Sequence, residues 1–196
     1  MKIIFAGPSA QSLSAALPDH EPTFIEDSLE ALDGGVLAAQ DLLISFGYRH
    51  LISQESLQIL NGRAVNIHIS LLPWNRGADP NFWSWATNTP KGVTVHWIDS
   101  GLDTGPIVKQ RVVDLSPDST LRETHSALLH AGAVLAVDSW TSLRAGVSRA
   151  QEPGGSYHKK ADLKEHLLAL TRGWDTRCRT VMEYGRERGL WINSPS

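Results

Sequence analysis

The chain has 196 residues, of which 41% are hydrophobic and 20% charged, and its formal net charge is −3 at pH 7. These values are typical of one globular domain with a real core, and they argue against a disordered chain or a dedicated nucleic-acid-binding protein. No apolar run approaches the roughly 18 residues of a membrane-spanning helix. We expect a cytoplasmic protein that has neither a membrane nor a nucleic-acid partner.

Strands and helices are predicted to alternate along the chain. Short apolar runs bounded by turn residues predict strands over residues 2–6, 23–26, 41–46, 64–69, 92–98 and 107–113. Helical spacing with caps or prolines predicts helices over residues 9–17, 53–60, 80–86, 120–143, 160–171 and 176–188. Asp79 is expected to cap the third helix, and Asp118 or Ser119 the fourth. This order predicts an α/β domain with a largely parallel sheet.

Three polar residues lie on or beside predicted strand ends. Asn66 and His68 are two positions apart in one strand, so both side chains project from the same face. Asp103 follows the next strand, in a loop of its own. A carboxylate delivered by a separate loop commonly orients or charges an active-site histidine. These three residues are the candidate catalytic group, whereas His96 is expected to be structural.

The sequence around these residues resembles the formyltransferase family, which uses 10-formyltetrahydrofolate. The matching segments are residues 41–48, 66–73 (Asn-Ile-His-Ile-Ser-Leu-Leu-Pro), 76–77, 92–99 and 101–105 (Gly-Leu-Asp-Thr-Gly). The family includes glycinamide ribonucleotide and methionyl-tRNA formyltransferases and N-formyltransferases of amino sugars. The resemblance implies a Rossmann-like sheet flanked by helices, with the folate at the carboxyl ends of its strands. We place the catalytic domain at residues 1–145 and a C-terminal helical extension, packed on the same domain, at residues 146–196.

The polar trio suits formyl transfer. An amine must attack the formyl carbon on N10 of the folate, which creates an oxyanion. Asn66 and His68 can donate hydrogen bonds to that oxygen. Asp103 would hold His68 in its charged form or relay the proton that leaves the amine, and either Asp103 or His68 could accept that proton.

The resemblance also assigns ligand-binding segments. It places the folate against Tyr48, Arg49, His50, Ile52, Ile98, Asp99 and Ser100. Ser9 in the first loop, and Trp74, Arg76 and Asp79 after the catalytic strand, are expected to bind the acceptor. Trp83 and Trp85 could form a stacking wall with Trp74, or they could be core residues. Arg76 and Asp79 could anchor the substrate or pair with each other.

Two features of the sequence bear on the identity of the acceptor amine. Pro8 removes a backbone N–H from the first loop, which disfavours a phosphate cradle of the glycinamide ribonucleotide type. The ending near residue 196 leaves no expected room for the β-barrel domain of methionyl-tRNA formyltransferases. We expect an amino sugar nucleotide, or an amino acid or peptide of specialised metabolism. The alternatives are a 10-formyltetrahydrofolate hydrolase, phosphoribosylglycinamide formyltransferase and a non-catalytic folate-binding module.

The assembly and the metal content are simpler expectations. Some members of the family pair, so a homodimer is left open. The single cysteine, Cys178, excludes an intrachain disulfide and a multi-cysteine metal site. No His, Cys, Asp or Glu residues have the spacing of metal ligands, so no metal is expected.

Overall fold

A central sheet of six strands organises the computed structural model, which describes residues 1–170 and 172–192. Its strands are β1 (Lys2–Ala6), β2 (Glu21–Ile25), β3 (Leu42–Ser45), β4 (Ala64–His68), β6 (Gly92–Trp97) and β7 (Ile107–Val112). They lie in the order β2-β1-β3-β4-β6-β7. The first four are mutually parallel and β6 is antiparallel to β4. The predicted α/β fold with a largely parallel sheet is therefore confirmed.

Helices connect most of these strands. The α-helices are α1 (Gln11–Ser14), α2 (Gly34–Ala38), α3 (Gln54–Ile59), α4 (Pro80–Ala86), α5 (Leu121–Asp138), α6 (Trp140–Arg144), α7 (Asp162–Ala169) and α8 (Cys178–Glu187). Two 3₁₀ turns, η1 (Leu29–Ala31) and η2 (Gly173–Asp175), and a two-stranded ladder of β5 (Arg76–Gly77) with β8 (Tyr157–His158) complete the fold. The helix predicted over 160–171 ends at Ala169, and residue 171 lies outside the described residues.

Helix α5 differs from the prediction in its N-terminal cap and in its C-terminal end. The start of α5 is capped by Thr120, not by Asp118 or Ser119. The amide of Glu123 donates to Thr120 Oγ1 at 3.2 Å, and the Thr120 amide donates to Glu123 Oε2 at 2.7 Å. This reciprocal capping box satisfies two backbone donors at once, which explains why it is preferred. The predicted helix 120–143 is broken at Ser139, whose hydroxyl donates to the Leu135 carbonyl at 2.6 Å.

Contacts divide the chain into two compact units. The first contains Met1–His68, Thr94–Lys109 and Gly132–Gln151, and the second contains Ile69–Val93, Gln110–Ala131 and Glu152–Ser196. Helix α5 and strands β6 and β7 contribute residues to both units. The domain boundary expected near residue 145 stays a prediction.

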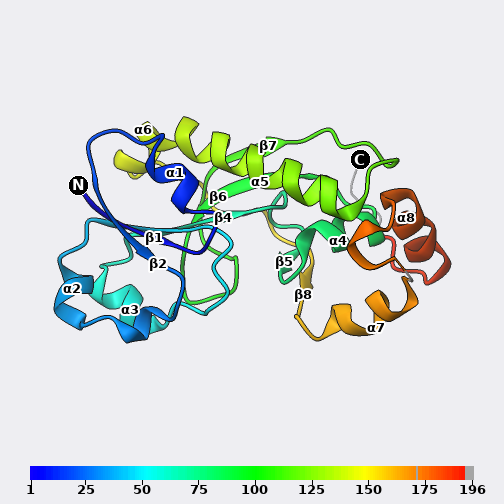
Figure 1. The fold of residues 1–196 in the computed structure, drawn as a ribbon, viewed down its shortest axis with the longest axis horizontal. Coiled ribbons are helices and arrows are strands. Elements are labelled where there is room, and N and C mark those ends of the chain that lie inside the picture. The colour runs from blue at the N-terminus through cyan, green and yellow to red at the C-terminus, as the bar shows by residue number, and fades with distance from the viewer. Residues whose placement is uncertain (171, 193–196) are drawn as a thin grey trace. The chain divides into compact units, whose positions relative to one another are not determined.

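The first unit builds its core on both faces of the sheet. Helices α2 and α3 lie on one side of the sheet (Figure 1). There Ile4, Leu43 and Ala64 pack with apolar side chains such as Leu37, Leu57 and Leu60. On the other face, Gly132 lets helix α5 approach closely, because an added Cβ would lie 3.0 Å from Ile67 Cγ2. Since side chains alternate along a strand, burial of Ile67 here sends Asn66 and His68 to the opposite face.

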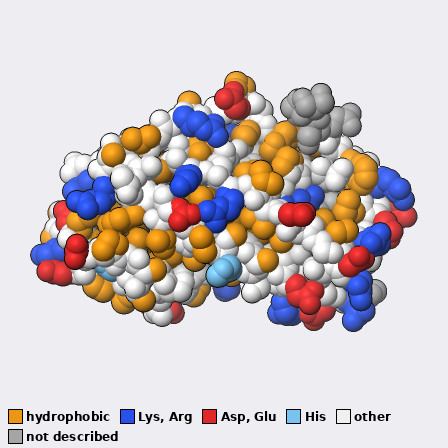
Figure 2. All heavy atoms as spheres, turned by 90° about the horizontal axis from the view of Figure 1, so that it is seen from above, with side chains coloured by type: hydrophobic (Ala, Val, Ile, Leu, Met, Phe, Trp, Pro, Cys, Tyr) orange, Lys and Arg blue, Asp and Glu red, His pale blue; other side chains and the backbone are white. Residues whose placement is uncertain are grey.

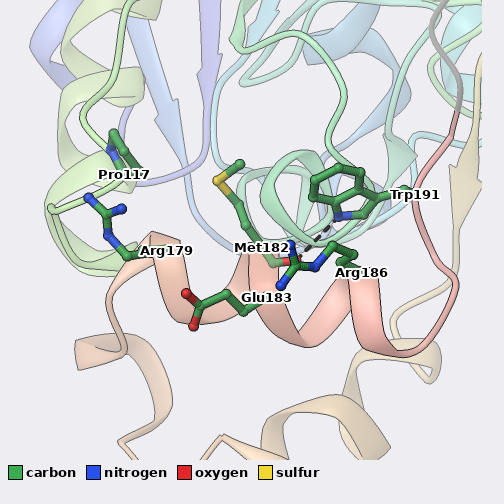
Figure 3. Close-up of a pocket in the computed structure, with 6 residues that line it drawn as sticks. All are labelled: Pro117, Arg179, Met182, Glu183, Arg186 and Trp191. Carbon is green, nitrogen blue, oxygen red and sulfur yellow. Dashed lines mark hydrogen bonds between the residues drawn. The ribbon is translucent and has the colours of Figure 1, made fainter.

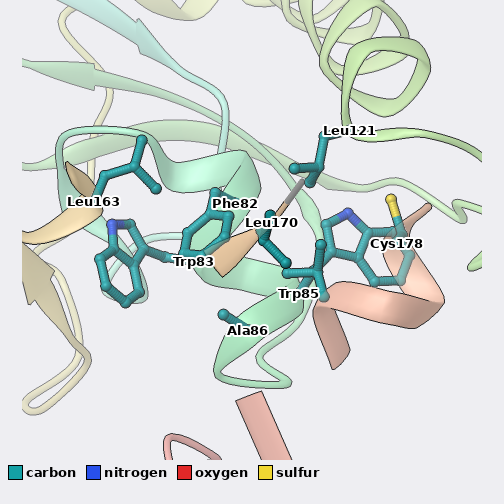
Figure 4. Close-up of a cluster of buried hydrophobic side chains, with 9 residues drawn as sticks. Phe82, Trp83, Trp85, Ala86, Leu121, Leu163, Leu170 and Cys178 are labelled. Atoms are coloured by element: carbon teal, nitrogen blue, oxygen red, sulfur yellow. The ribbon is translucent and has the colours of Figure 1, made fainter. Parts of the chain in front are cut away.

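The second unit has a separate aromatic core. Phe82, Trp83 and Trp85 of helix α4 pack with Leu121, Leu163, Leu170, Cys178 and Val181 (Figure 4). In the view of Figure 4 the two indoles leave α4 on opposite sides, and each is only 3% exposed. The alternative that Trp83 and Trp85 form a stacking wall for a ligand is therefore wrong. Burying the large apolar surface of an indole stabilises the fold by more than keeping its single polar N–H in solvent would.

His158 is stacked on this core and gives a pH-dependent prediction. Its ring lies 4.0 Å from that of Trp83, at an interplanar angle of 5°. Burial lowers the pKa of His158 from 6.5 to about 4; nearby His166 acts in the same direction, and Asp162 opposes it. The unfolded chain therefore binds a proton that the folded chain does not bind between these two pH values. Stability should fall as pH decreases through this window, by on the order of 1 kcal/mol given the partial exposure of the ring.

Replacing His158 with Phe tests this assignment, because Phe keeps a stacked ring but does not titrate. Urea unfolding midpoints should fall more steeply between pH 6.5 and pH 4 in the wild type than in the variant. Parallel curves for the two proteins would show that His158 does not carry this dependence.

On the face shown in Figure 2, acidic and basic side chains are interspersed with apolar ones. Both signs of charge are present over the surface drawn there, which agrees with a formal net charge of only −3.

Within residues 1–170 and 172–192, no helix combines the length and the apolar character that crossing a membrane requires.

Candidate active site

A row of polar side chains crosses three neighbouring strands of the first unit. In the sheet register, Asn66 of β4 is opposite Ser45 of β3 on one side and His96 of β6 on the other. Residues opposite each other in a sheet share a face, so the three side chains meet. Ser45 Oγ donates to Asn66 Oδ1 at 3.0 Å, which fixes the amide so that its NH₂ group faces His96. Asn66 is thus held from both sides.

Asp103 reaches this row from the loop between β6 and β7. Its Oδ1 accepts a hydrogen bond from Asn66 Nδ2 at 3.2 Å and lies 3.5 Å from His96 Nε2. Its Oδ2 lies 3.6 Å from His68 Nδ1. The side chains of His68, His96 and Asp103 are 7%, 2% and 11% exposed. The structure therefore brings Asn66, His68 and Asp103 together in a nearly buried cluster, as the strand spacing suggests.

His96 belongs to the same cluster. Its Nδ1 lies 2.8 Å from the Trp97 carbonyl, which can only accept, so Nδ1 carries a hydrogen. A neutral His96 then offers Nε2 as an acceptor to Asn66 Nδ2, 3.4 Å away. A protonated His96 instead donates from Nε2 to Asp103. The ring can satisfy the cluster in either charge state, which suits a site through which a proton passes.

The role of His96 leads to a specific prediction. Replacing His96 with Phe keeps a ring but removes the nitrogen that faces Asp103 and Asn66. A hydrogen bond to a charged group is worth about 1.5–3 kcal/mol, so kcat for the reaction proposed below should fall about tenfold to a hundredfold. The matched control is His20→Phe, because His20 is in the same unit and its ring contacts Ser14 and Phe5, which are outside the cluster. Equal activity of the two variants would leave His96 with a structural role alone.

The residues predicted to bind folate lie on two loops of the first unit. The side chain of Tyr48 is fixed by two hydrogen bonds. Its hydroxyl donates to the Asp27 carbonyl and accepts from the Leu29 amide, both at 2.8 Å. Burial raises the pKa of this hydroxyl. Ile52 and Ile98 pack with Tyr48 against the same apolar cluster, whereas Arg49, His50, Asp99 and Ser100 are exposed. The folate assignment of all seven residues stays a prediction.

Ser9 lies close to the same loops. An added Cβ on Gly47 would be 3.1 Å from Ser9 Oγ, and one on Gly7 would be 2.6 Å from both the Phe46 oxygen and the Tyr48 nitrogen. The loops after β1 and β3 therefore touch at these two glycines, at the carboxyl ends of their strands. Ser9 is half-buried at this contact, and its role in acceptor binding stays a prediction.

Trp74, Arg76 and Asp79 belong to the second unit, and all three are half-buried. Arg76 lies on the β5–β8 ladder, and its Nη1 donates to the Gly154 carbonyl at 3.2 Å. Asp79 is at the N-cap position of α4 as predicted, but its side chain makes no cap hydrogen bond. Its backbone is left-handed, with φ of 53°, which differs from the extended conformation of a capping residue. Burial raises the pKa of its carboxyl, against the opposing effects of Lys160 and His125.

A cavity of about 180 Å³ is found elsewhere in the second unit (Figure 3). It is lined by Pro117, Arg179, Met182, Glu183, Arg186 and Trp191. Trp191 Nε1 donates to the Met182 carbonyl at 3.2 Å and so holds the indole over helix α8. None of the residues predicted to bind folate or the acceptor lines this cavity.

Two residues of the cluster have no role in the sequence-based prediction. Ser45 lies within the strand predicted over residues 41–46, without a role, and His96 is expected to be structural. The signal for both is the pairing of β3, β4 and β6, which places them beside Asn66. That register depends on which strands become neighbours, and no local pattern in the sequence specifies it.

The chain is similar to known proteins in sequence and in fold. The family model described as "Formyl transferase" matches residues 21–138. The solved formyltransferase PseJ from Anoxybacillus kamchatkensis, in complex with UDP-4,6-dideoxy-4-formamido-L-AltNAc and tetrahydrofolate, is 41% identical, with a TM-score of 0.85. That match covers 94% of this chain and 100% of the other. A 4-N formyltransferase from Francisella tularensis is 18% identical and shares the fold, with a TM-score of 0.75 over 93% of this chain and 86% of the other.

A curated relative extends the comparison to a longer protein. Methionyl-tRNA formyltransferase of Trichlorobacter lovleyi is 28% identical over 183 residues, which cover 92% of this chain. The chain spans only 57% of the length of that relative.

Proposed function

Because the chain belongs to the formyl transferase family, we propose that it transfers the formyl group of 10-formyltetrahydrofolate to the amine of a nucleotide-linked amino sugar. The observation that carries the proposal is the cluster of Asn66, His68 and Asp103, an arrangement of donors and a proton acceptor that this reaction needs. The sugar nucleotide is favoured by the 41% identity to PseJ, which extends over the full length of that chain.

The proposed chemistry assigns separate tasks to the cluster. The amine nitrogen bonds to the formyl carbon, and the carbonyl oxygen becomes an oxyanion that Asn66 and His68 stabilise by donating hydrogen bonds. Asp103 accepts the amine proton, directly or through His68. As the oxyanion collapses, the bond from carbon to N10 breaks and the proton passes to N10. The products are the formamide and tetrahydrofolate, and no oxidant is needed.

The loops of the first unit suit a folate. Leu51 and Leu102 are exposed apolar side chains, at 79% and 40% exposure, on the loops that follow β3 and β6. The same loops carry the predicted folate-binding residues and Asp103. Exposed apolar side chains can pack against the flat face of a pterin. The backbone polar groups beside them can form hydrogen bonds to its edges.

Within the second unit, the proposed acceptor-binding residues are Trp74, Arg76 and Asp79. Arg76 can bind a diphosphate, because a guanidinium presents a fork of donors to phosphate oxygens. The Asp79 carboxyl is held in a left-handed backbone without a capping role, so it can accept hydrogen bonds from sugar hydroxyl groups or the amine. Trp74 would pack against an apolar face of the ligand.

Release of tetrahydrofolate tests the proposal. The protein is mixed with 10-formyltetrahydrofolate, and absorbance is followed without an amine and with a panel of UDP- and dTDP-linked amino sugars, amino acids and peptides. Release only with an amino sugar nucleotide is the expected result. Release without any amine would identify a hydrolase, release with amino acids or peptides would change the acceptor class, and no release at all would favour a binding module.

A further inference from the structure

We propose that Gln151 is a positioning residue for the formyl-transfer cluster, holding Asp103 in place through its backbone. The proposal rests on the function proposed above. Gln151 belongs to the segment after helix α6, 48 positions from Asp103, and to the same compact unit.

The side-chain amide of Gln151 binds the loop that carries Asp103 at two points. Its Nε2 donates to the Asp103 carbonyl at 2.8 Å and to the Gly105 carbonyl at 2.9 Å. An amide NH₂ group has two hydrogens, and these two bonds use both of them. Because the two carbonyls flank Thr104, the bonds act as a clamp across the peptide segment next to the catalytic carboxylate.

The clamp also fixes an uncommon backbone conformation at Asp103. Its φ is 54°, in the left-handed region that residues other than glycine seldom adopt. A conformation of this kind persists only when its surroundings determine it. On the other side of the loop, Asp99 Oδ1 accepts from the Gly101 amide at 3.0 Å and from Thr104 Oγ1 at 2.6 Å. The side chains of Asp99 and Gln151 thus hold the loop from two directions.

Gln151 is itself anchored to the sheet. Two residues before it, Arg149 exchanges backbone hydrogen bonds with Ile107 at 2.7 and 2.9 Å. Ile107 is the first residue of β7, where the chain leaves the Asp103 loop. The clamp therefore starts from the strand next to the loop, so a movement of Asp103 would have to break bonds to an ordered element.

The consequence of the clamp is a kinetic one. The Asp103 carboxylate is 3.2 Å from Asn66 Nδ2 and 3.6 Å from His68 Nδ1. A shift of 1 Å would break both contacts. A misplacement of that size can cost about 10² in rate. Substrate affinity depends on other residues, so the effect should fall on kcat.

The test compares two substitutions at Gln151 with a matched one at Gln40. Gln151→Met keeps the length of the side chain without a donor, and Gln151→Glu puts an acceptor against the two carbonyls. Gln40→Met is the control, because Gln40 Nε2 also donates to a carbonyl in this unit, that of Val36 at 3.0 Å, but outside the cluster. Gln151→Met should lower kcat about tenfold to a hundredfold with KM within about twofold. Gln151→Glu should lower kcat further, and Gln40→Met should leave it unchanged.

A double-mutant cycle separates positioning from general damage. If Gln151 acts through Asp103, Gln151→Met should cost little in single-turnover rate when Asp103 is already Asn. A loss as large in that background as in the wild type, or a kcat within twofold of wild type for Gln151→Met, would overturn the proposal.

A measurement without turnover keeps this test apart from the proposed function. The ¹⁵N signals of the His68 and His96 rings report the position of the carboxylate beside them. Gln151→Met should shift these signals and Gln40→Met should not, whether or not the protein formylates any amine. Unshifted His68 and His96 signals in Gln151→Met would refute the clamp even in an active enzyme. Shifted signals in a protein without transfer activity would refute only the proposed reaction.

Discussion

Replacing Asp103 with Asn is expected to lower kcat about a thousandfold while KM for either substrate changes little. The carboxylate lies within 3.6 Å of His68, His96 and Asn66, and it is the acidic group of the cluster. Asn keeps the shape but can neither accept a proton nor pair with an imidazolium. Proton transfer by a positioned side chain typically contributes about 10²–10⁴ in rate, so the expected loss is in the middle of that range.

Steady-state formylation rates with the preferred amine measure this effect. The control is Asp41→Asn, because Asp41 accepts from the Lys2 amide at 2.8 Å in the same unit but outside the cluster. Asp41→Asn should be close to wild type in kcat. A near-native rate for Asp103→Asn would remove the carboxylate from the proposed mechanism.

The second large effect is expected when His68 or Asn66 loses its donor. His68→Ala and Asn66→Ala should each lower kcat by about 10²–10³, the usual cost of removing one donor to an oxyanion. Asn66 has two tasks, because its Nδ2 also donates to Asp103 at 3.2 Å and faces His96 at 3.4 Å. Donation to an oxyanion requires one of these contacts to lengthen, so Asn66→Ala also removes a contact that holds the carboxylate.

The double variant His68→Ala, Asn66→Ala shows whether the two residues act in the same step or in separate steps. Because both residues serve one oxyanion and one carboxylate, the combined loss should be smaller than the product of the single losses. Ser45→Ala should lower kcat less than either single variant does, because Ser45 acts by orienting the Asn66 amide. Its Oγ donates to Asn66 Oδ1 at 3.0 Å. A fully multiplicative double variant would assign Asn66 and His68 to independent steps.

Local patterns carry enough information for most strands and for the shared face of Asn66 and His68. The run from Val65 to His68 alternates apolar and polar residues, and the structure buries Ile67 on one face and places Asn66 and His68 on the other. The Pro80 signal at the start of α4 marks that helix correctly. These features depend on neighbours in sequence, which is why the sequence predicts them.

Long-range contacts explain what the sequence does not predict. Ser45 and His96 join the cluster through the strand register, and Gln151 joins it through a loop 48 positions away from Asp103. Helix α2 begins with two glycines, poor helix formers, and it forms where Asp33 caps it and Leu37 reaches the core. Tertiary packing overrides propensity in such cases.

Formylation of a labelled acceptor tests the central claim most directly. The protein is incubated with 10-formyltetrahydrofolate labelled with ¹³C in the formyl group and a UDP-linked amino sugar, and the sugar nucleotide is analysed by mass spectrometry. The account predicts that the product carries one labelled formyl group on its amine, and that Asp103→Asn gives almost none in the same time. Labelled formate with an unmodified sugar nucleotide would contradict it.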